Sequence, residues 1–117
     1  MDKVTVIGGS GFLGSHVADE LTRRGYNVTV LDRVSSPWVQ NAQEIVIGDM
    51  LDGDLVRKVC DGSRFLYHFG GVADIEEAKS KPFETIETNV LGATTALEVS
   101  RTLSVERFIY ASSMYVY

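Results

Sequence analysis

The residues with the clearest chemical meaning lie in the glycine-rich segment VIGGSGFLGSH near the N-terminus. Its glycines satisfy G-x-G-x-x-G at Gly9, Gly11 and Gly14, and G-x-x-G-x-x-G when Gly8 replaces Gly9. In such patterns one glycine allows a tight turn out of a strand, another lets backbone approach a pyrophosphate, and the last lets a helix pack against the strand. Because the helix N-terminus offers N–H groups and partial positive charge, the segment predicts a diphosphate site. The alternative is a glycine turn that serves only close packing.

An acidic residue, Asp32, stands at the end of the next apolar run, NVTVLD. In dinucleotide-binding domains an acid at this place accepts hydrogen bonds from the adenosine ribose diol, and its charge repels a 2′-phosphate. Asp32 therefore favours NAD over NADP, but the adjacent Arg33 leaves NADP open because an arginine there can accommodate the phosphate. No Gly-Lys-Ser/Thr follows the glycines, which excludes a nucleoside triphosphatase loop.

The elements that must position these residues follow from the apolar pattern, which alternates between short β-branched runs and longer helical stretches. The predicted strands cover residues 3–7, 27–32, 44–47, 64–68 and 107–112, and the predicted helices cover residues 12–24, 55–60 and 82–103. Right-handed crossovers then give an α/β fold, a Rossmann-type doubly wound parallel sheet with strand order 3-2-1-4-5. The order reverses between strands 1 and 4, where ligands bind in such sheets and where GGSG and HFGG both fall.

Composition limits the domain count and the class of partner. The 117 residues are enough for one domain with one core. A hydrophobic share of 44% without a run of about 18 apolar residues predicts a soluble protein, which we place in the cytoplasm. A net charge of −5 argues against nucleic acid or an anionic membrane as a partner, because clustered Lys and Arg bind these. The single cysteine, Cys60, fits a reducing compartment and is expected to be a small apolar residue near a helix end.

Several stretches, in order along the whole chain, resemble the extended short-chain dehydrogenase/reductase family, the NAD-dependent nucleotide-sugar epimerases and dehydratases. They are VIGGSGFLGSHVADEL, VLDR, GDM, YHFGGV, ETNVLGATTALEVSR and YASSMYVY. The resemblance implies NAD as cofactor, a nucleotide sugar as substrate, and hydride transfer to and from NAD. It covers only the first part of such an enzyme.

The resemblance also implies a role for individual residues. In chain order these are Gly8, Gly11 and Gly14 at the pyrophosphate, Phe12 and Leu13 after the turn, Asp32 at the ribose with Arg33 beside it, Asp49 and Met50 at the adenine, Phe69, Gly70 and Gly71 along the cofactor, Asn89 steadying the backbone near the active site, Ser112 on the nicotinamide side, and Ser113 as the catalytic serine. The family usually has Leu-Ala-Ala where this chain has Phe-Gly-Gly, a departure expected to loosen the backbone.

Simpler roles remain open for several of these and other residues. Asp49 would serve as a helix cap, and Asn89 in isolation would face solvent. Trp38 either covers the adenine or belongs to a surface patch. His68 is expected to be a hydrogen-bonded structural residue, and His16 to pack or face solvent. No His, Cys, Asp and Glu cluster has metal-ligand spacing, so we expect no metal.

Catalysis in this family needs a tyrosine of lowered pKa, assisted by a lysine in Tyr-x-x-x-Lys. None of the five tyrosines has a lysine four residues later, and the last lysine is Lys81. Tyr115 and Tyr117 follow the serine and lie outside that motif. We therefore expect residues 1–117 to be the N-terminal cofactor-binding domain of a longer enzyme, truncated after the fifth strand and inactive alone. An unpaired strand edge would then favour self-association.

Two other functions remain open. One is a non-catalytic dinucleotide-binding or redox-sensing module, which would bind the cofactor without a catalytic pair. The other is a reductase or sterol-type dehydrogenase of the same family, which would share these residues but use another substrate.

Overall fold

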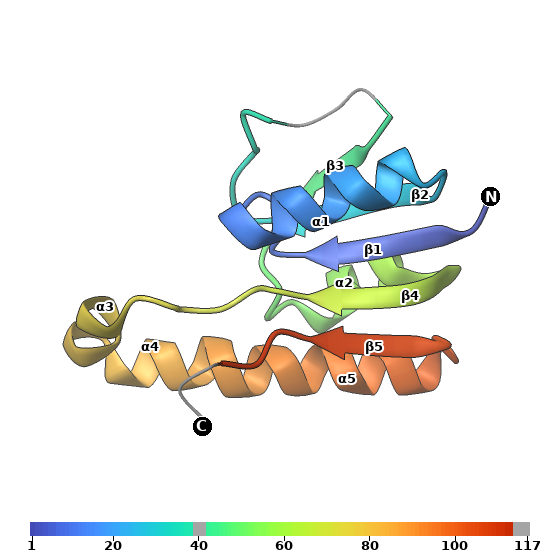
Figure 1. Cartoon of the computed structure of the whole chain (residues 1–117). Coiled ribbons are helices and arrows are strands. Elements are labelled where there is room, and N and C mark those ends of the chain that lie inside the picture. The colour runs from blue at the N-terminus through green and yellow to red at the C-terminus, as the bar shows by residue number, and fades with distance from the viewer. Residues whose placement is uncertain (39–41, 114–117) are drawn as a thin grey trace.

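The chain folds around a five-stranded parallel sheet with helices on both faces (Figure 1). The computed structural model describes residues 1–38 and 42–113. The strands are β1 (Lys3–Ile7), β2 (Asn27–Asp32), β3 (Glu44–Ile47), β4 (Ser63–His68) and β5 (Arg107–Tyr110), in the sheet order β3-β2-β1-β4-β5. The predicted doubly wound sheet and its strand order are confirmed. Because every neighbouring pair is parallel, the carboxyl ends of these strands meet at one edge of the sheet.

The helices differ from the prediction in two places. They are α1 (Phe12–Arg23), α2 (Gly53–Cys60), α3 (Ile75–Ser80), α4 (Pro82–Ile86), the π-helical turn η1 (Glu87–Leu91) and α5 (Gly92–Thr102). The prediction missed α3, which is capped by the Asp74 carboxylate accepting the Glu76 N–H at 2.9 Å but is too short to show an apolar period. It also gave one regular helix over residues 82–103, where the π-helical turn η1 separates α4 from α5.

Two apolar layers join the sheet to the helices. Towards α1 lie Val4, Val6, Val28 and Val30, packed on Ala18 and Leu21. Towards α2 and α5 lie Ile7, Leu31 and Leu66, packed on Val56, Val59, Cys60, Ala96 and Val99. Strand β2 contributes to both layers because successive side chains point to opposite faces, and it is therefore buried on both sides. Burial raises the pKa of the Cys60 thiol to about 11, which makes it a protonated core residue at neutral pH.

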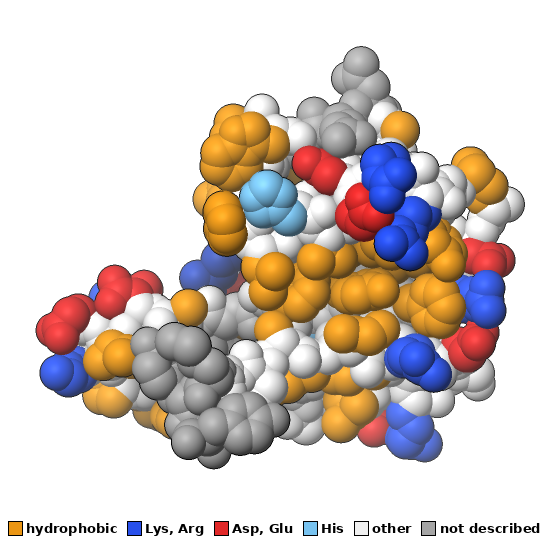
Figure 2. All heavy atoms as spheres, in the orientation of Figure 1, with side chains coloured by type: hydrophobic (Ala, Val, Ile, Leu, Met, Phe, Trp, Pro, Cys, Tyr) orange, Lys and Arg blue, Asp and Glu red, His pale blue; other side chains and the backbone are white. Residues whose placement is uncertain are grey.

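One area of the sheet is uncovered in the described part of the chain. Helix α1 packs on β1 and β2. On the same face of the sheet, β4 and β5 carry the half-buried side chains of Phe65, Tyr67 and Ile109. Figure 2 shows hydrophobic side chains gathered on this face. A cavity of about 310 Å³ lies there between α1 and β4, lined in part by Tyr26, Phe65 and Tyr67. We call this area the uncovered face.

His68, the last residue of β4, is a buried histidine next to the carboxyl edge of the sheet. It is 1% exposed, and its ring stacks on Phe108 and Tyr110 of β5 at centroid distances of 6.2 and 6.0 Å. Among the described residues neither ring nitrogen has a hydrogen-bond partner, so the expected hydrogen bonds are absent there. Burial lowers the pKa of His68 below its usual 6.5 because the charged imidazolium is poorly solvated.

This burial makes stability depend on pH through His68. The unfolded chain binds the proton more tightly, so the free energy of unfolding is fully retained above pH 6.5 and falls as pH drops below it, by at most about 1.4 kcal/mol per pH unit. Urea unfolding between pH 8 and pH 5 measures this slope. His68→Phe keeps an aromatic ring without the titration, so the slope should shrink in this variant. An equal slope in both proteins would contradict the assignment.

Candidate functional site

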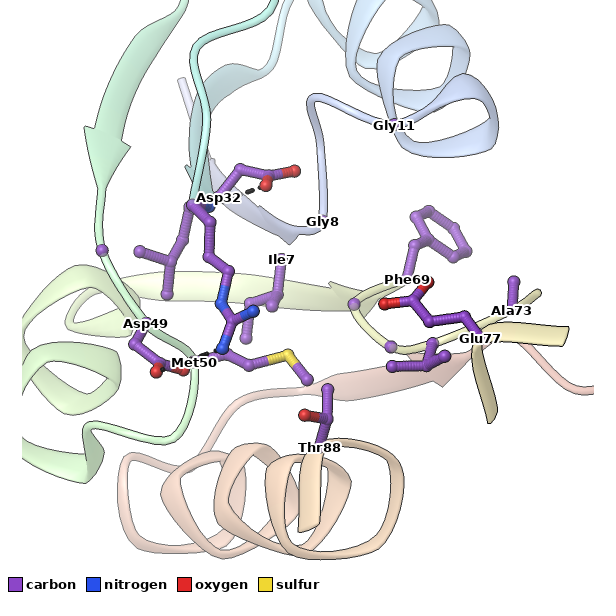
Figure 3. A pocket seen from close by; sticks show the side chains of 16 residues that line it. Ile7, Gly8, Gly11, Asp32, Asp49, Met50, Phe69, Ala73, Glu77 and Thr88 are labelled. Carbon is purple, nitrogen blue, oxygen red and sulfur yellow. Dashed lines mark hydrogen bonds and ion pairs between the residues drawn. The ribbon is translucent and has the colours of Figure 1, made fainter. Parts of the chain in front are cut away.

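A cavity of about 280 Å³ opens at the carboxyl edge of the sheet, where the strand order reverses between β1 and β4 (Figure 3). The predicted residues that line it are Gly8, Gly11, Asp32, Arg33, Asp49, Met50, Phe69, Gly70 and Gly71. They come from the ends of β1, β2, β3 and β4, which are far apart in the sequence. The fold therefore brings most of the predicted residues together at the predicted place.

The glycine turn between β1 and α1 combines two kinds of glycine. Gly8 has φ +80°, and a Cβ there would lie 2.6 Å from the Gly70 nitrogen, while a Cβ on Gly14 would overlap the Gly8 carbonyl oxygen. Both are required by packing within the chain. Gly11 has φ −77°, and a Cβ there would meet only the Gly8 oxygen, at an ordinary 3.5 Å. Nothing in the described chain requires a glycine at position 11, although its backbone lines the cavity.

Asp32 is held in one orientation by backbone N–H groups. One carboxylate oxygen accepts the Ser10 N–H at 3.0 Å, and the other accepts the Arg33 and Val34 N–H groups at 2.7 and 3.4 Å. The Ser10 hydroxyl donates to the Val34 carbonyl at 2.8 Å, which ties the glycine turn to the loop after β2. A carboxylate has about four acceptor positions, so some capacity remains for a ligand in the cavity.

Arg33 reaches across the cavity rim to the loop after β3. Its Nη2 lies 3.5 Å from Oδ2 of Asp49, and both side chains are largely exposed. An exposed pair of this kind is worth roughly 0–1 kcal/mol, so it orients the guanidinium without fixing it. Oδ1 of Asp49 accepts the Leu51 N–H at 2.9 Å, and α2 is capped by Asp52 instead. The alternative that Asp49 is a helix cap is wrong.

Asn89 lies beneath the loop that follows β4. Its Oδ1 accepts the Val72 N–H at 2.7 Å, and its Nδ2 donates to the Val72 carbonyl at 3.0 Å. A Cβ on Gly71, which has φ +153°, would lie 2.8 Å from that Oδ1. The amide therefore clasps the backbone of the cavity wall, and the simpler role of a solvent-facing residue is wrong. Asn89 belongs to η1, and π-helical turns often mark functional sites.

Other predicted residues lie outside the described cavity lining. They are Phe12 and Leu13, which are 80% and 52% exposed at the start of α1, Gly14 and Asn89, and the exposed Ser112 and Ser113 beyond β5. Tyr115 and Tyr117 fall outside the described residues. His16 is exposed, with its ring edge-on to Phe12 at 4.8 Å, as expected.

Part of the cavity wall is formed by residues that no sequence pattern predicted. Glu77, Thr88 and Ala73 line it, and Figure 3 shows Glu77 and Ala73 across the cavity from Asp32 and Asp49. Glu77 belongs to α3, the helix that lacked an apolar signal, and Thr88 to η1, so no pattern pointed to either. Three carboxylates and one guanidinium lie on its rim, so any phosphate bound here would have to be held by backbone N–H groups and the α1 dipole.

No group of three or more His, Cys, Asp or Glu side chains in the described ranges 1–38 and 42–113 could hold a metal ion. None of the helices in those ranges has the length and apolar character needed to cross a membrane.

Known proteins match both the sequence and this geometry. The NAD dependent epimerase/dehydratase family matches residues 4–117. The chain belongs to this family. A UDP-glucose 4-epimerase of Erwinia amylovora is 32% identical over 97% of the chain and 37% of its own length. The chain thus spans a little over a third of such relatives, and their family confirms the resemblance found in the sequence.

Solved structures of the family superpose closely on the fold. A UDP-glucose 4-epimerase of Thermotoga maritima with UDP-glucose has a TM-score of 0.90 and 28% identity, and matches 95% of the chain and 38% of its own length. A UDP-glucose 4-epimerase of Thermus thermophilus in complex with NAD has a TM-score of 0.86 and 29% identity, and matches 95% of the chain and 37% of its own length.

The Asn89 clasp predicts a measurable local effect. Asn89→Ala leaves both polar groups of Val72 without their partner, so the free energy of unfolding should fall by about 1–3 kcal/mol. Hydrogen exchange at the Val72 amide should accelerate more than exchange in β1. Thr94→Ala, at an exposed site of the neighbouring helix α5, is the control and should change stability by less than about 0.5 kcal/mol. Unchanged Val72 exchange in Asn89→Ala would rule the clasp out.

Proposed function

We propose that residues 1–117 form a cofactor-binding domain that holds NAD in the cavity at the carboxyl edge of the sheet. The observation that carries this proposal is Gly11. Gly8 and Gly14 are explained by packing inside the chain, but Gly11 has space for a side chain and an ordinary φ. A bound pyrophosphate lying against the turn explains a glycine there, whereas a turn built only for close packing does not.

The phosphate and ribose contacts follow from this placement. The pyrophosphate lies over the turn of Gly8, Gly11 and Gly14 at the start of α1, where Phe12 and Leu13 begin the helix and the first helical N–H groups have no acceptor within the helix. Asp32 accepts hydrogen bonds from the adenosine ribose diol with the capacity that its three backbone partners leave free. The anion is thus bound without a basic cluster.

The adenine lies towards the loop after β3, between Asp49 and Met50. Arg33 is directed to Asp49, away from the Asp32 carboxylate, and a 2′-phosphate would approach that carboxylate at a high electrostatic cost. This arrangement favours NAD over NADP. Trp38 lies 61% exposed on the loop after β2, within the part of the chain that would flank the base.

The nicotinamide half runs towards β4 and β5, past Phe69, Gly70 and Gly71, whose backbone Asn89 steadies through Val72. Ser112 lines the nicotinamide side, and Ser113 hydrogen-bonds the substrate oxygen that is oxidised or reduced. We expect the domain to contribute to epimerisation or dehydration of a nucleotide sugar, for which NAD would accept a hydride from a sugar carbon and later return it. UDP-glucose 4-epimerases among the relatives support this substrate class.

NAD binding by the chain itself is the direct test, since the 117 residues hold no Tyr-x-x-x-Lys. Trp38 is the single tryptophan, so its fluorescence should change as NAD is added, and isothermal titration should give the dissociation constant. Gly11→Ala should weaken NAD binding by about tenfold, equivalent to about 1.4 kcal/mol, because its Cβ enters the space of the pyrophosphate. The midpoint of urea unfolding should fall only slightly, because alanine is less favourable than glycine at the N-cap of α1 while its Cβ meets no close neighbour within the chain.

NADP is the control ligand for this experiment and should bind more weakly than NAD. The proposal fails if the wild-type chain shows no NAD binding at about 1 mM, a concentration that corresponds to a binding free energy of about −4.1 kcal/mol. Equal NAD affinity in Gly11→Ala and in the wild type would show that position 11 is not a glycine on account of a bound pyrophosphate, and would contradict the proposal.

The uncovered face and the outer edge of β5 point to self-association. Exposed apolar strand edges pair with other chains, and β5 has a partner only at β4 in the described sheet. Sedimentation velocity at tens of micromolar should therefore show species heavier than the 12.9 kDa chain. Ile109→Lys places a charge on the uncovered face and should shift the distribution towards the monomer. Val34→Lys, at an exposed site after β2, should not. A wild-type chain that sediments as one monomer would overturn this proposal.

A further inference from the structure

The backbone conformations of Gly70 and Gly92 do not require glycine. The described glycines with positive φ are Gly8, Gly25, Gly62 and Gly71, so Gly70 is not one of them. Gly92 has φ −60° and ψ −46°, which are ordinary helical values. Alanine is compatible with this helical backbone and is favoured over glycine inside a helix. The reason for glycine at positions 70 and 92 therefore lies in what surrounds them.

Both glycines face the same side chain, that of Met50. A Cβ on Gly70 would overlap Sδ of Met50 and lie 3.3 Å from Cγ2 of Ile7. A Cβ on Gly92 would lie 2.7 Å from Cε of Met50. The thioether thus lies in a slot between the loop after β4 and the first turn of α5. Figure 3 shows Met50 in the cavity, close to Ile7 and Thr88.

The slot decides where Met50 can move. Ile7 and the β4 loop close it on one side, and α5 closes it on the other, so the open side is the cavity itself. A methyl group at either glycine would push the flexible thioether towards the ligand space. Such a shift changes the chain's stability little, because the displaced atoms are the far end of an unbranched side chain.

We propose that Gly70 and Gly92 are positioning residues for cofactor binding, which hold the Met50 thioether in the cavity floor and keep the space above it open for a planar base. The inference rests on the proposed function of this cavity. A thioether beneath an aromatic ring also contributes a favourable sulfur–aromatic contact. Met50 touches the base, and the two glycines act through Met50.

Gly92→Ala separates positioning from stability. Alanine at this helical position should leave the midpoint of urea unfolding unchanged or raise it. NAD binding should nevertheless weaken by roughly threefold to tenfold, the range of a lost sulfur–aromatic contact. Gly53→Ala is the matched control, because Gly53 also begins a helix and its Cβ would lie 3.8 Å from the nearest atom, Cγ2 of Thr95. Wild-type NAD affinity in Gly92→Ala would overturn the proposal.

A rescue experiment tests the role of Met50 directly. Gly70→Ala should weaken NAD binding in the wild-type background, since the methyl group displaces the thioether. Met50→Val removes the atoms that collide, so adding Gly70→Ala to this variant should cause no further loss of affinity. If the two substitutions weaken binding additively, Gly70 does not act through Met50 and the proposal is wrong.

The same variants also test the packing of Met50 in the slot when no cofactor is added. Met50→Val leaves a void beside Gly70, and the methyl group of Gly70→Ala partly fills it. Gly70→Ala should therefore raise the urea midpoint in the Met50→Val background and not in the wild type. If Gly70→Ala shifts the urea midpoint in the same direction in both backgrounds, Met50 does not fill a slot beside Gly70 and the proposal is wrong. Absence of NAD binding to the wild type would instead refute the proposed function, so the two failures are distinguishable.

Discussion

The close approach of the chain at the exits of β1 and β4 is the constraint on which the site depends. A Cβ on Gly8 would lie 2.6 Å from the Gly70 nitrogen and 2.7 Å from the Phe69 carbonyl carbon, so no side chain fits between the two exits. This contact sets the glycine turn against the loop after β4 at the point where the sheet order reverses. The cavity, its Asp32 wall and its Met50 floor are all arranged around it.

Local signals in the sequence predict the sheet and half of the cavity. The β-branched runs gave β1, β2 and β3 with their observed bounds, and the spacing of glycines and Asp32 gave one wall of the site. The other wall depends on contacts between distant residues. The Asn89 clasp on Val72 spans 17 positions, and no local pattern encodes it. Helix α3 is too short for an apolar period, which left Glu77 unrecognised.

The Phe-Gly-Gly segment was expected to loosen the backbone, but the structure shows neighbours that restrain it. Gly71 is held against Oδ1 of Asn89, whose amide binds the next residue, and Gly70 packs on Met50. The space that a methyl group would occupy at Gly70 is filled by a thioether from a different loop. The glycine at position 70, which departs from the usual family pattern, is thus matched by the long side chain of Met50 in another loop. A comparison of position 70 alone would miss this pairing.

The residues proposed to bind the cofactor and the residues proposed to take part in the chemistry are positioned to different degrees. The glycine turn, Asp32 and Met50 are positioned by hydrogen bonds and packing among loops that the chain itself supplies. Ser112 and Ser113 lie exposed beyond β5, outside the cavity lining of the described residues. The role proposed for Ser113 requires a substrate held beside it, and neither serine is among the described residues that line the cavity. A surface that covers β5 on the α1 side of the sheet would bury Ile109 together with Phe65 and Tyr67 of the neighbouring strand β4.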